Sequence, residues 1–175
     1  MASKRPTYRK QHKRGTTTQP RRYAAGTSVT TDRSRTEVEK LLKCHGATGF
    51  ICAWDDEADT EVLMCRIQGR MLRFNVTKPQ IQNFMYTEQG RPRMAALAEK
   101  ARMAEYRRRW RALLLLVKAK LEAIAAEVST FDREFLADMC LSTGDTVGQW
   151  MGTQLDAVYM EGKMPLQLPG IIQGS

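Results

Sequence analysis

The sequence predicts an α+β fold with a short helix, a three-stranded antiparallel meander, a long helix packed on it and a C-terminal helical pair, and three observations support it. Residues 1–31 carry no hydrophobic period, which is typical of a disordered basic arm. Residues 48–76 contain three runs rich in β-branched and aromatic residues, separated by turn signals. Residues 93–128 lack Gly and Pro and have apolar residues at helical spacing. Because 175 residues leave room for one domain, we expect the arm over 1–31 and a single α+β domain over 32–175.

The net charge of +9 lies entirely at the N-terminal end. Residues 1–35 hold ten basic side chains and one acidic one (10 − 1 = +9), and the remaining 140 residues hold 18 of each. That remainder is neutral but polarised, since residues 91–120 have ten basic and two acidic side chains and residues 121–175 have two and eight. The pI near 9.7 therefore describes the arm and not the folded part.

Serine and threonine residues mark the predicted starts of the short helices. Ser34 is followed three residues later by Glu37, the spacing of a capping box, which predicts a helix from Ser34 to Gly46. Ser129 and Thr146 are predicted to cap the two C-terminal helices. An extended end is expected over Met164–Gly170.

The meander is predicted from alternation and from two turns. The strands are expected over residues 48–54, 60–68 and 71–76, with an acidic turn at 55–59 and a tight turn at 68–70. Cys52 and Cys65 are expected to be neighbours across the first hairpin, as core thiols.

The long helix has the strongest periodic signal in the chain. Its apolar residues recur at steps of three and four and form one seam: Met103, Tyr106, Trp110, Leu114, Val117, Leu121, Ile124 and Val128. One helix of about 30 residues is predicted.

The arm is the first candidate site, because flexible Lys and Arg residues displace counterions from a phosphate backbone. Tyr8 or Tyr23 could stack on a base. The alternatives are a solvated tail, an acidic protein partner or a transit peptide, although the arm lacks the amphipathic face of a transit peptide. The candidate nucleic-acid-binding residues of the arm are Lys4, Arg5, Arg9, Lys10, Lys13, Arg14, Arg21 and Arg22.

The second candidate is a basic stripe on the long helix, made of Lys100, Arg107, Arg111 and Lys118. Their spacings of 7, 4 and 7 predict one shared face, opposite the apolar seam. With Arg108, the arginines of this stripe could orient a nucleic-acid strand. The alternative is that they pair with the acidic C-terminal third or solvate the helix.

The residues offer little for metal binding or catalysis. Cys44, His45, Cys52 and Cys65 match no common zinc spacing. The carboxylates of residues 55–61 sit on a predicted hairpin tip, and no Lys occurs in 44–77 to complete a nuclease site. There is no P-loop or nucleophile-elbow motif and no apolar run long enough for a membrane span. We therefore expect no catalytic residue, metal or cofactor, and no membrane partner; free thiols suit a cytoplasmic protein.

Several segments resemble small uncharacterised proteins encoded by tailed bacteriophages and prophages. The resemblance rests on Arg107–Glu122 (RRRWRALLLLVKAKLE), Thr130–Asp138 (TFDREFLAD), Thr146–Met151 (TVGQWM), Met164–Gly170 (MPLQLPG) and Gly46–Phe50. It implies a bacterial cytoplasmic setting and tasks in DNA replication, recombination or host take-over, and it brings no catalytic residues. In architecture alone, a meander followed by a long basic helix is similar to single-strand annealing proteins, which implies single-stranded DNA between the sheet and the helix that bears Arg107 and Arg111.

Three functions follow as expectations. The first is a non-catalytic nucleic-acid-binding accessory protein of replication or recombination, with DNA preferred over RNA. The second is a protein-interaction module, either an inhibitor of a host factor or a self-assembling homo-oligomer. The third is a metal-dependent nuclease that uses Asp55 and Asp59.

Overall fold

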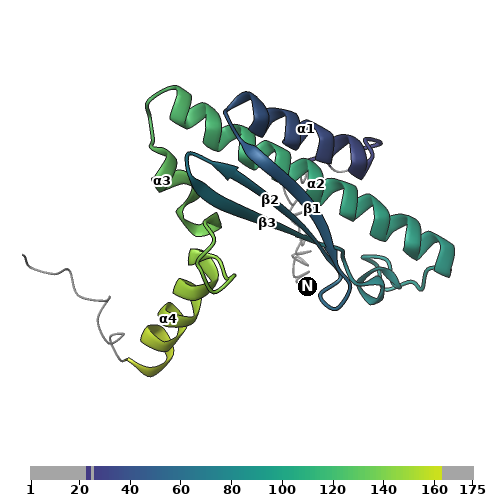
Figure 1. The fold of residues 1–175 in the computed structure, drawn as a ribbon. Helices are drawn as coiled ribbons and strands as arrows, with labels where there is room; N and C mark the ends of the chain where they lie inside the picture. The colour runs from purple at the N-terminus through teal and green to yellow at the C-terminus, as the bar shows by residue number, and fades with distance from the viewer. Residues whose placement is uncertain (1–22, 25, 163–175) are drawn as a thin grey trace, which may run out of the picture.

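A three-stranded antiparallel sheet with two long neighbouring helices on one face forms the centre of the molecule (Figure 1). The computed structural model describes residues 23–24 and 26–162, so the basic residues 1–22 and the predicted extended end lie outside the described residues. The mixed α+β architecture is as predicted. The elements are α1 (Thr31–Cys44), β1 (Thr48–Asp55), β2 (Thr60–Ile67), β3 (Arg70–Thr77), the 3₁₀ helix η1 (Ile81–Phe84), α2 (Ala95–Ala125), α3 (Phe131–Phe135), the 3₁₀ helix η2 (Leu136–Asp138) and α4 (Val147–Glu161).

The sheet is built from two hairpins in the order β1-β2-β3. The β2–β3 hairpin closes with Ile67 opposite Arg70, and both turn residues, Gln68 and Gly69, have positive φ (49° and 75°). This turn geometry matches the right-handed twist of the strands. Side chains that face the helices are buried, and their neighbours point to the open face. The buried ones are Leu63, Cys65, Ile67, Leu72, Phe74 and Val76.

Strand β1 lies at the free edge of the sheet and is exposed along nearly its whole length. A bulge between Thr48 and Ile51 contains Gly49, whose φ of 61° favours glycine. Cys52 pairs with Leu63 and not with Cys65, and Cys52 is exposed while Cys65 is buried. The prediction of two neighbouring core thiols was therefore wrong, because no further strand of the described chain covers β1.

The apolar seam of α2 forms the core over most of its length. Tyr106, Trp110, Val117 and Leu121 are buried, and Met103, Leu114 and Ile124 pack at the edge of the core. Val128 is the exception, with 78% of its side chain exposed. The helix ends at Ala125, and the chain turns away at Glu127, which has a φ of 57°. The last position of the predicted seam is therefore outside the helix.

Two of the three predicted caps are displaced. Helix α1 is capped by Thr30, whose hydroxyl accepts a hydrogen bond from the Arg33 amide at 3.2 Å. Ser34 lies one turn inside the helix, where its hydroxyl is buried and donates to the carbonyl oxygen of Thr30. Glu37 pairs with arginines and does not fold back onto the backbone.

The starts of the C-terminal helices follow the same chemistry. Thr130 caps α3 in place of Ser129, and its hydroxyl accepts from the Arg133 amide. Thr146 caps α4 as predicted, in a complete capping box with Gln149.

The segment between α3 and α4 covers the outer edge of β3. Met139 bridges to Leu72, and the Cys140 amide donates to the carbonyl oxygen of Met71 at 2.8 Å. The following helix, α4, extends away from the sheet (Figure 1). Its Leu155, Tyr159 and Met160 are exposed. Among the described elements, only β1 thus leaves a sheet edge open.

Candidate nucleic-acid interface

Helices α1 and α2 lie side by side and run in the same direction (Figure 1). Their contact joins Arg35 to Trp110, with the guanidinium 5.4 Å from the ring centre, and Glu37 to Arg111, with an N–O distance of 2.5 Å. The stripe on α2 therefore does not lie opposite the apolar seam as predicted. It lies next to the seam, on the flank that faces α1, because each stripe residue Arg107, Arg111 and Lys118 directly follows a seam residue.

A groove of about 390 Å³ lies at the junction of α1, α2 and the segment that precedes α1. Residues 26–30 pass along α2, since the Arg107 Nε donates to the carbonyl oxygen of Thr27 at 3.4 Å. Tyr23 reaches the groove with half of its side chain exposed. The groove is lined by Tyr23, Glu37, Leu41, Arg111, Leu114, Leu115 and Lys118.

The two cations that line the groove, Arg111 and Lys118, differ in whether they have an ion-pair partner among the described residues. The hydrogen bond from Arg111, aided by Arg33, holds the pKa of Glu37 below its usual value, so this carboxylate is ionised at neutral pH. Arg111 therefore has a partner inside the protein. Lys118 is exposed and has no ion-pair partner among residues 23–24 and 26–162. Lys118 is thus the free cation of this groove.

The other predicted stripe residues are engaged in different ways. Arg108 holds the carboxylate of Glu105 with two hydrogen bonds of 2.7 and 2.5 Å, so its guanidinium is occupied within α2. Neighbouring Arg109 donates to the carbonyl oxygen of Thr77 at 2.6 Å. Lys100 is exposed, and no partner for it occurs within the described part of the chain.

The alternative pairing with the acidic C-terminal third is wrong for this stripe. The ion pairs to that third come from Lys120, which meets Asp138 at 2.6 Å, and from Arg70, which meets Asp132 at 3.8 Å. The architectural likeness implied that Arg107 and Arg111 line a space between α2 and the sheet. Instead, they face α1 and the segment before it.

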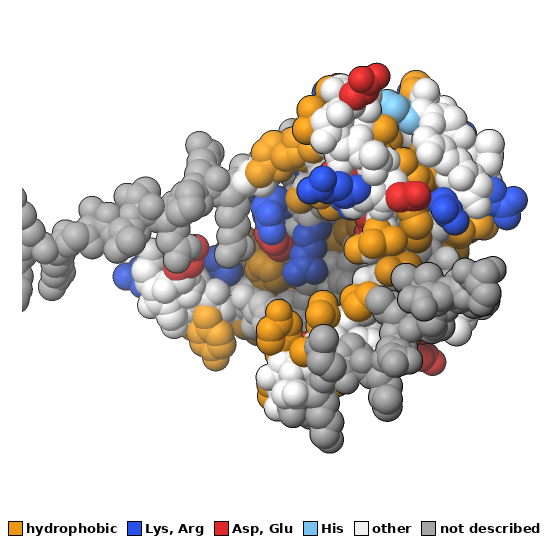
Figure 2. Space-filling view, turned by 90° about the vertical axis from the view of Figure 1, so that its left-hand side faces the viewer, with side chains coloured by type: hydrophobic (Ala, Val, Ile, Leu, Met, Phe, Trp, Pro, Cys, Tyr) orange, Lys and Arg blue, Asp and Glu red, His pale blue; other side chains and the backbone are white. Residues whose placement is uncertain are grey.

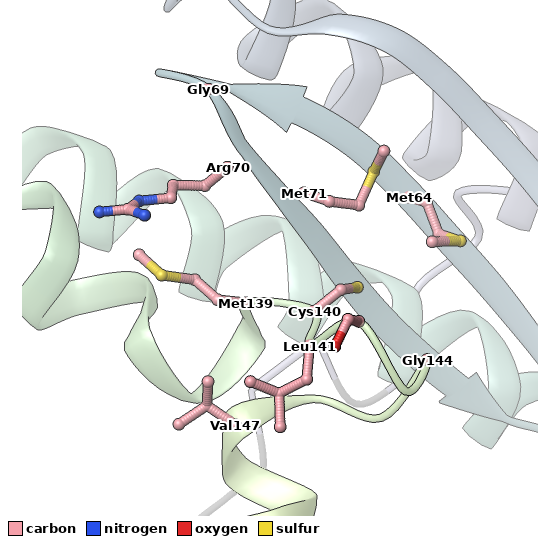
Figure 3. A pocket seen from close by; sticks show the side chains of 10 residues that line it. Met64, Gly69, Arg70, Met71, Met139, Cys140, Leu141, Gly144 and Val147 are labelled. Atoms are coloured by element: carbon pink, nitrogen blue, oxygen red, sulfur yellow. The ribbon is translucent and has the colours of Figure 1, made fainter. Parts of the chain in front are cut away.

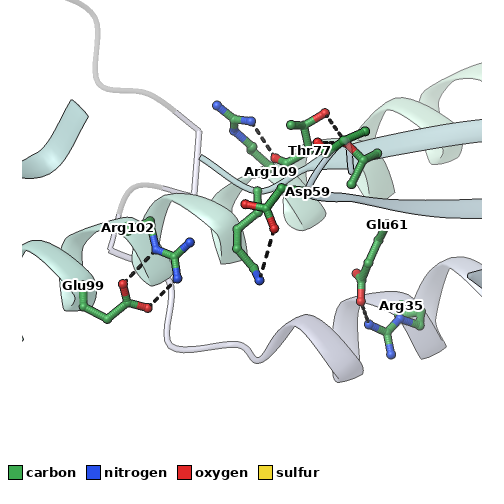
Figure 4. Close-up of polar contacts among 10 residues, drawn as sticks. Arg35, Asp59, Glu61, Thr77, Glu99, Arg102 and Arg109 are labelled. Carbon is green, nitrogen blue, oxygen red and sulfur yellow. Dashed lines mark hydrogen bonds and ion pairs between the residues drawn. The ribbon is translucent and has the colours of Figure 1, made fainter. Parts of the chain in front are cut away.

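A polar cluster anchors α1 to the sheet close to the groove. Arg35 of α1 forms an ion pair with Glu61 of β2 (Figure 4). The Tyr106 hydroxyl and the Trp110 indole nitrogen are buried beside them, without a hydrogen bond of proper geometry to any described residue. Burial, followed by the influence of Glu61, raises the pKa of Tyr106. The cluster fixes the position of α1, and hence the width of the groove.

The acidic hairpin tip has turn contacts instead of a converging set of ligands. Asp55 accepts hydrogen bonds from the amides of Glu57 and Ala58, and Asp59 pairs with Lys78 at 3.6 Å (Figure 4). Within the described residues, no three His, Cys, Asp or Glu side chains are placed to hold one metal ion. Among the same residues, no helix is long and apolar enough to cross a membrane.

A second hollow, of about 600 Å³, lies on the open face of the sheet (Figure 3). Its walls are formed by Met64 and Met71 from the sheet, by Met139 and Leu141 from the segment between α3 and α4, and by Val147 at the start of α4. None of the predicted site residues that the structure describes lies there. The pattern of three methionines on three separate elements could not be recognised as one site before the chain was folded.

No family model, curated protein or solved structure matched this chain. The resemblance to phage and prophage proteins therefore stays a prediction from the sequence segments themselves.

Proposed function

We propose that this chain is a non-catalytic nucleic-acid-binding accessory protein of the phage type, acting in DNA replication or recombination. One observation carries the proposal: Tyr23, which directly follows the basic residues 1–22 in the sequence, lines the same groove as Arg111 and Lys118. The basic residues 1–22 are therefore joined to the described part of the chain at this groove.

The distribution of charge supports a division of labour between arm and groove. Residues 1–22 hold eight basic side chains and no acidic one, whereas residues 23–162 hold 19 of each (28 − 8 − Lys163 = 19). A neutral body attracts a phosphate backbone only weakly. The arm thus supplies most of the affinity, and the groove orients the bound strand.

The test compares the full chain with a chain that lacks residues 1–22. Binding of a fluorescent DNA oligonucleotide is measured by anisotropy at about 50 and 200 mM salt. The full chain should lose affinity steeply with salt, and the shortened chain should bind weakly with a shallower slope, because each phosphate that the arm neutralises adds about 0.7 to 0.9 to the slope. Equal slopes for the two chains would contradict the role of the arm.

A matched pair of charge reversals tests the groove in the same assay. Lys118→Glu should weaken binding, because it replaces the free cation with a carboxylate. Arg133→Glu on α3 is the control, because Arg133 is also exposed and also lacks an ion-pair partner among the described residues. Equal effects of the two substitutions would show a general charge effect and no groove.

A protein-interaction module is the second candidate, favoured by the apolar surface that the fold leaves open. Ile51 on the free strand β1 is 54% exposed, and Tyr159 on α4 is 83% exposed. On the side of the molecule that faces the viewer in Figure 2, hydrophobic side chains gather around a hollow that also contains basic side chains. Open edges and apolar patches favour pairing with another chain. A light-scattering mass of one 19.9 kDa chain at high concentration would remove self-assembly from this candidate.

A further inference from the structure

We infer that the groove between α1 and α2 binds one nucleotide of a single strand, with its base stacked on Tyr23 and its phosphate on Lys118. The inference rests on the proposed function and specifies its substrate class: single-stranded nucleic acid in preference to a duplex.

The packing of α2 argues against a duplex ligand. A helix with its side chains is about 10–12 Å across, and the major groove of DNA, about 12 Å wide, admits one such helix. Here α1 lies beside α2 along the stripe, and the two are joined by the Glu37–Arg111 pair. Two helices side by side are too wide to enter a major groove, so α2 cannot read the bases of a duplex from there. The unstacked bases of a single strand can reach the groove without such an insertion.

The size of the groove fits one unstacked base with its sugar. Its volume of about 390 Å³ lies at the lower end of the range for pockets that hold small molecules, about 300–1,000 Å³. In a duplex the bases are stacked inside, and taking one out costs a few kcal/mol. A single strand presents its bases without that cost.

The lining has an apolar and a charged part, as a nucleotide does. Tyr23 offers a half-exposed ring, and Leu114 and Leu115 offer apolar contacts. Stacking of a base on an aromatic ring contributes about 1–3 kcal/mol and accepts any base. Lys118 supplies for the phosphate an ammonium group that no described carboxylate pairs with.

The Glu37 carboxylate sets the direction in which the nucleotide lies. It pairs with Arg33 and Arg111, so these guanidiniums are engaged and Lys118 is left as the phosphate end of the groove. The base then lies toward Glu37 and Tyr23, where the carboxylate can accept a hydrogen bond from a base amino group.

The experiment measures the affinity of the full chain, Tyr23→Ala and Tyr23→Phe for a single-stranded DNA oligonucleotide, the same sequence in RNA, and the DNA duplex, at one salt concentration. Tyr23→Ala should weaken binding of the single strand about 5- to 150-fold, which corresponds to the energy of one stacked base. Binding of the duplex should stay the same within about twofold, and Tyr23→Phe should keep the full affinity for the single strand, since it keeps the ring.

The outcomes separate this inference from the proposed function. Equal losses on single strand and duplex, or no loss with Tyr23→Ala, would overturn the nucleotide site and leave binding through the arm intact. No binding of any nucleic acid by the full chain would overturn both. The DNA and RNA strands differ only in the sugar and in the thymine methyl group, so their comparison identifies which strand the groove prefers. The circular dichroism spectrum of Tyr23→Ala should match that of the full chain, because Tyr23 precedes the first helix.

Discussion

At the scale of single residues, packing divides the four cysteines into two chemical classes. Cys44 and Cys52 are exposed, whereas Cys65 is buried under the helices and Cys140 is partly covered beside it. Burial raises the pKa of the Cys65 thiol to about 11, and it also raises the pKa values of Cys52 and Cys140. Only the thiolate is a nucleophile, so these thiols differ in reactivity although all are free.

The first prediction concerns thiol labelling of the native protein. At pH 8, a thiol reagent should modify Cys44 first, because it is exposed, whereas burial raises the pKa of the other three thiols. Cys65 should react only after unfolding in guanidinium. The measurement is labelling followed by peptide mass spectrometry, and modification of Cys65 in the native protein at the rate of Cys44 would contradict the packing.

The second prediction concerns stability at alkaline pH. Folding raises the pKa of both Cys65 and Tyr106, so the folded state favours their neutral forms. The contribution of Cys65 is therefore complete below the unfolded pKa of the thiol, which is 9.0, and is lost as the pH rises toward about 11. The contribution of Tyr106 is complete below the unfolded pKa of the phenol, which is 10.0, and is lost at higher pH.

Urea unfolding at a series of pH values measures this effect. The midpoint should fall above pH 9 in the wild-type chain, and the fall should be shallower in the double variant Cys65→Ala, Tyr106→Phe. The same slope in both chains would assign the alkaline loss to other groups.

At the scale of elements, the docking of α4 depends on a close approach at one glycine. A Cβ added at Gly148 would lie 2.9 Å from the carbonyl oxygen of Ala137 and 3.2 Å from its Cβ. Gly152, one turn further along α4, has open space at the same position. A larger side chain would therefore collide with Ala137 at position 148 and would have room at position 152.

The third prediction uses this matched pair. Gly148→Ala should destabilise the protein by about 1–3 kcal/mol, because a backbone oxygen cannot move aside as a flexible side chain can. Gly152→Ala should stabilise it by about 0.5–1 kcal/mol, because alanine loses less freedom in a helix. Chemical unfolding measures both, with amide exchange to locate the change in α4; destabilisation by both variants would contradict the difference in packing.

The helices and strands differ in how well their positions could be predicted from the sequence. The strands and α2 were predicted closely, because periodicity and turn residues act over a few neighbours. The caps at Ser34 and Ser129 were misplaced because a threonine stood nearby each time. The side-chain hydroxyl that accepts a hydrogen bond from the unpaired amides of the first helical turn is set by the path of the chain into the helix. Composition does not reveal that path.

At the scale of the whole molecule, charge and fold are separated along the chain. Residues 1–22 carry +8, and residues 23–175 carry 20 basic and 19 acidic side chains, a net charge of +1. The fourth prediction is that a chain without residues 1–22 has an isoelectric point near neutrality, far below 9.7, and its lowest solubility near that pH at low salt. Isoelectric focusing and a solubility series measure this, and a pI still above 9 would mean that the body is basic in its own right.

The basic arm, the three strands, the long apolar seam and the separation of charge were determined by the sequence alone, because each is a local property of composition or spacing. The tertiary structure alone decided which flank of α2 its stripe occupies, that Tyr23 lines the same groove as Lys118, and that Cys52 is exposed while Cys65 is not. Those features depend on which elements lie side by side. A spacing of seven or four residues fixes a direction around one helix, but only the position of α1 determines what lies in that direction.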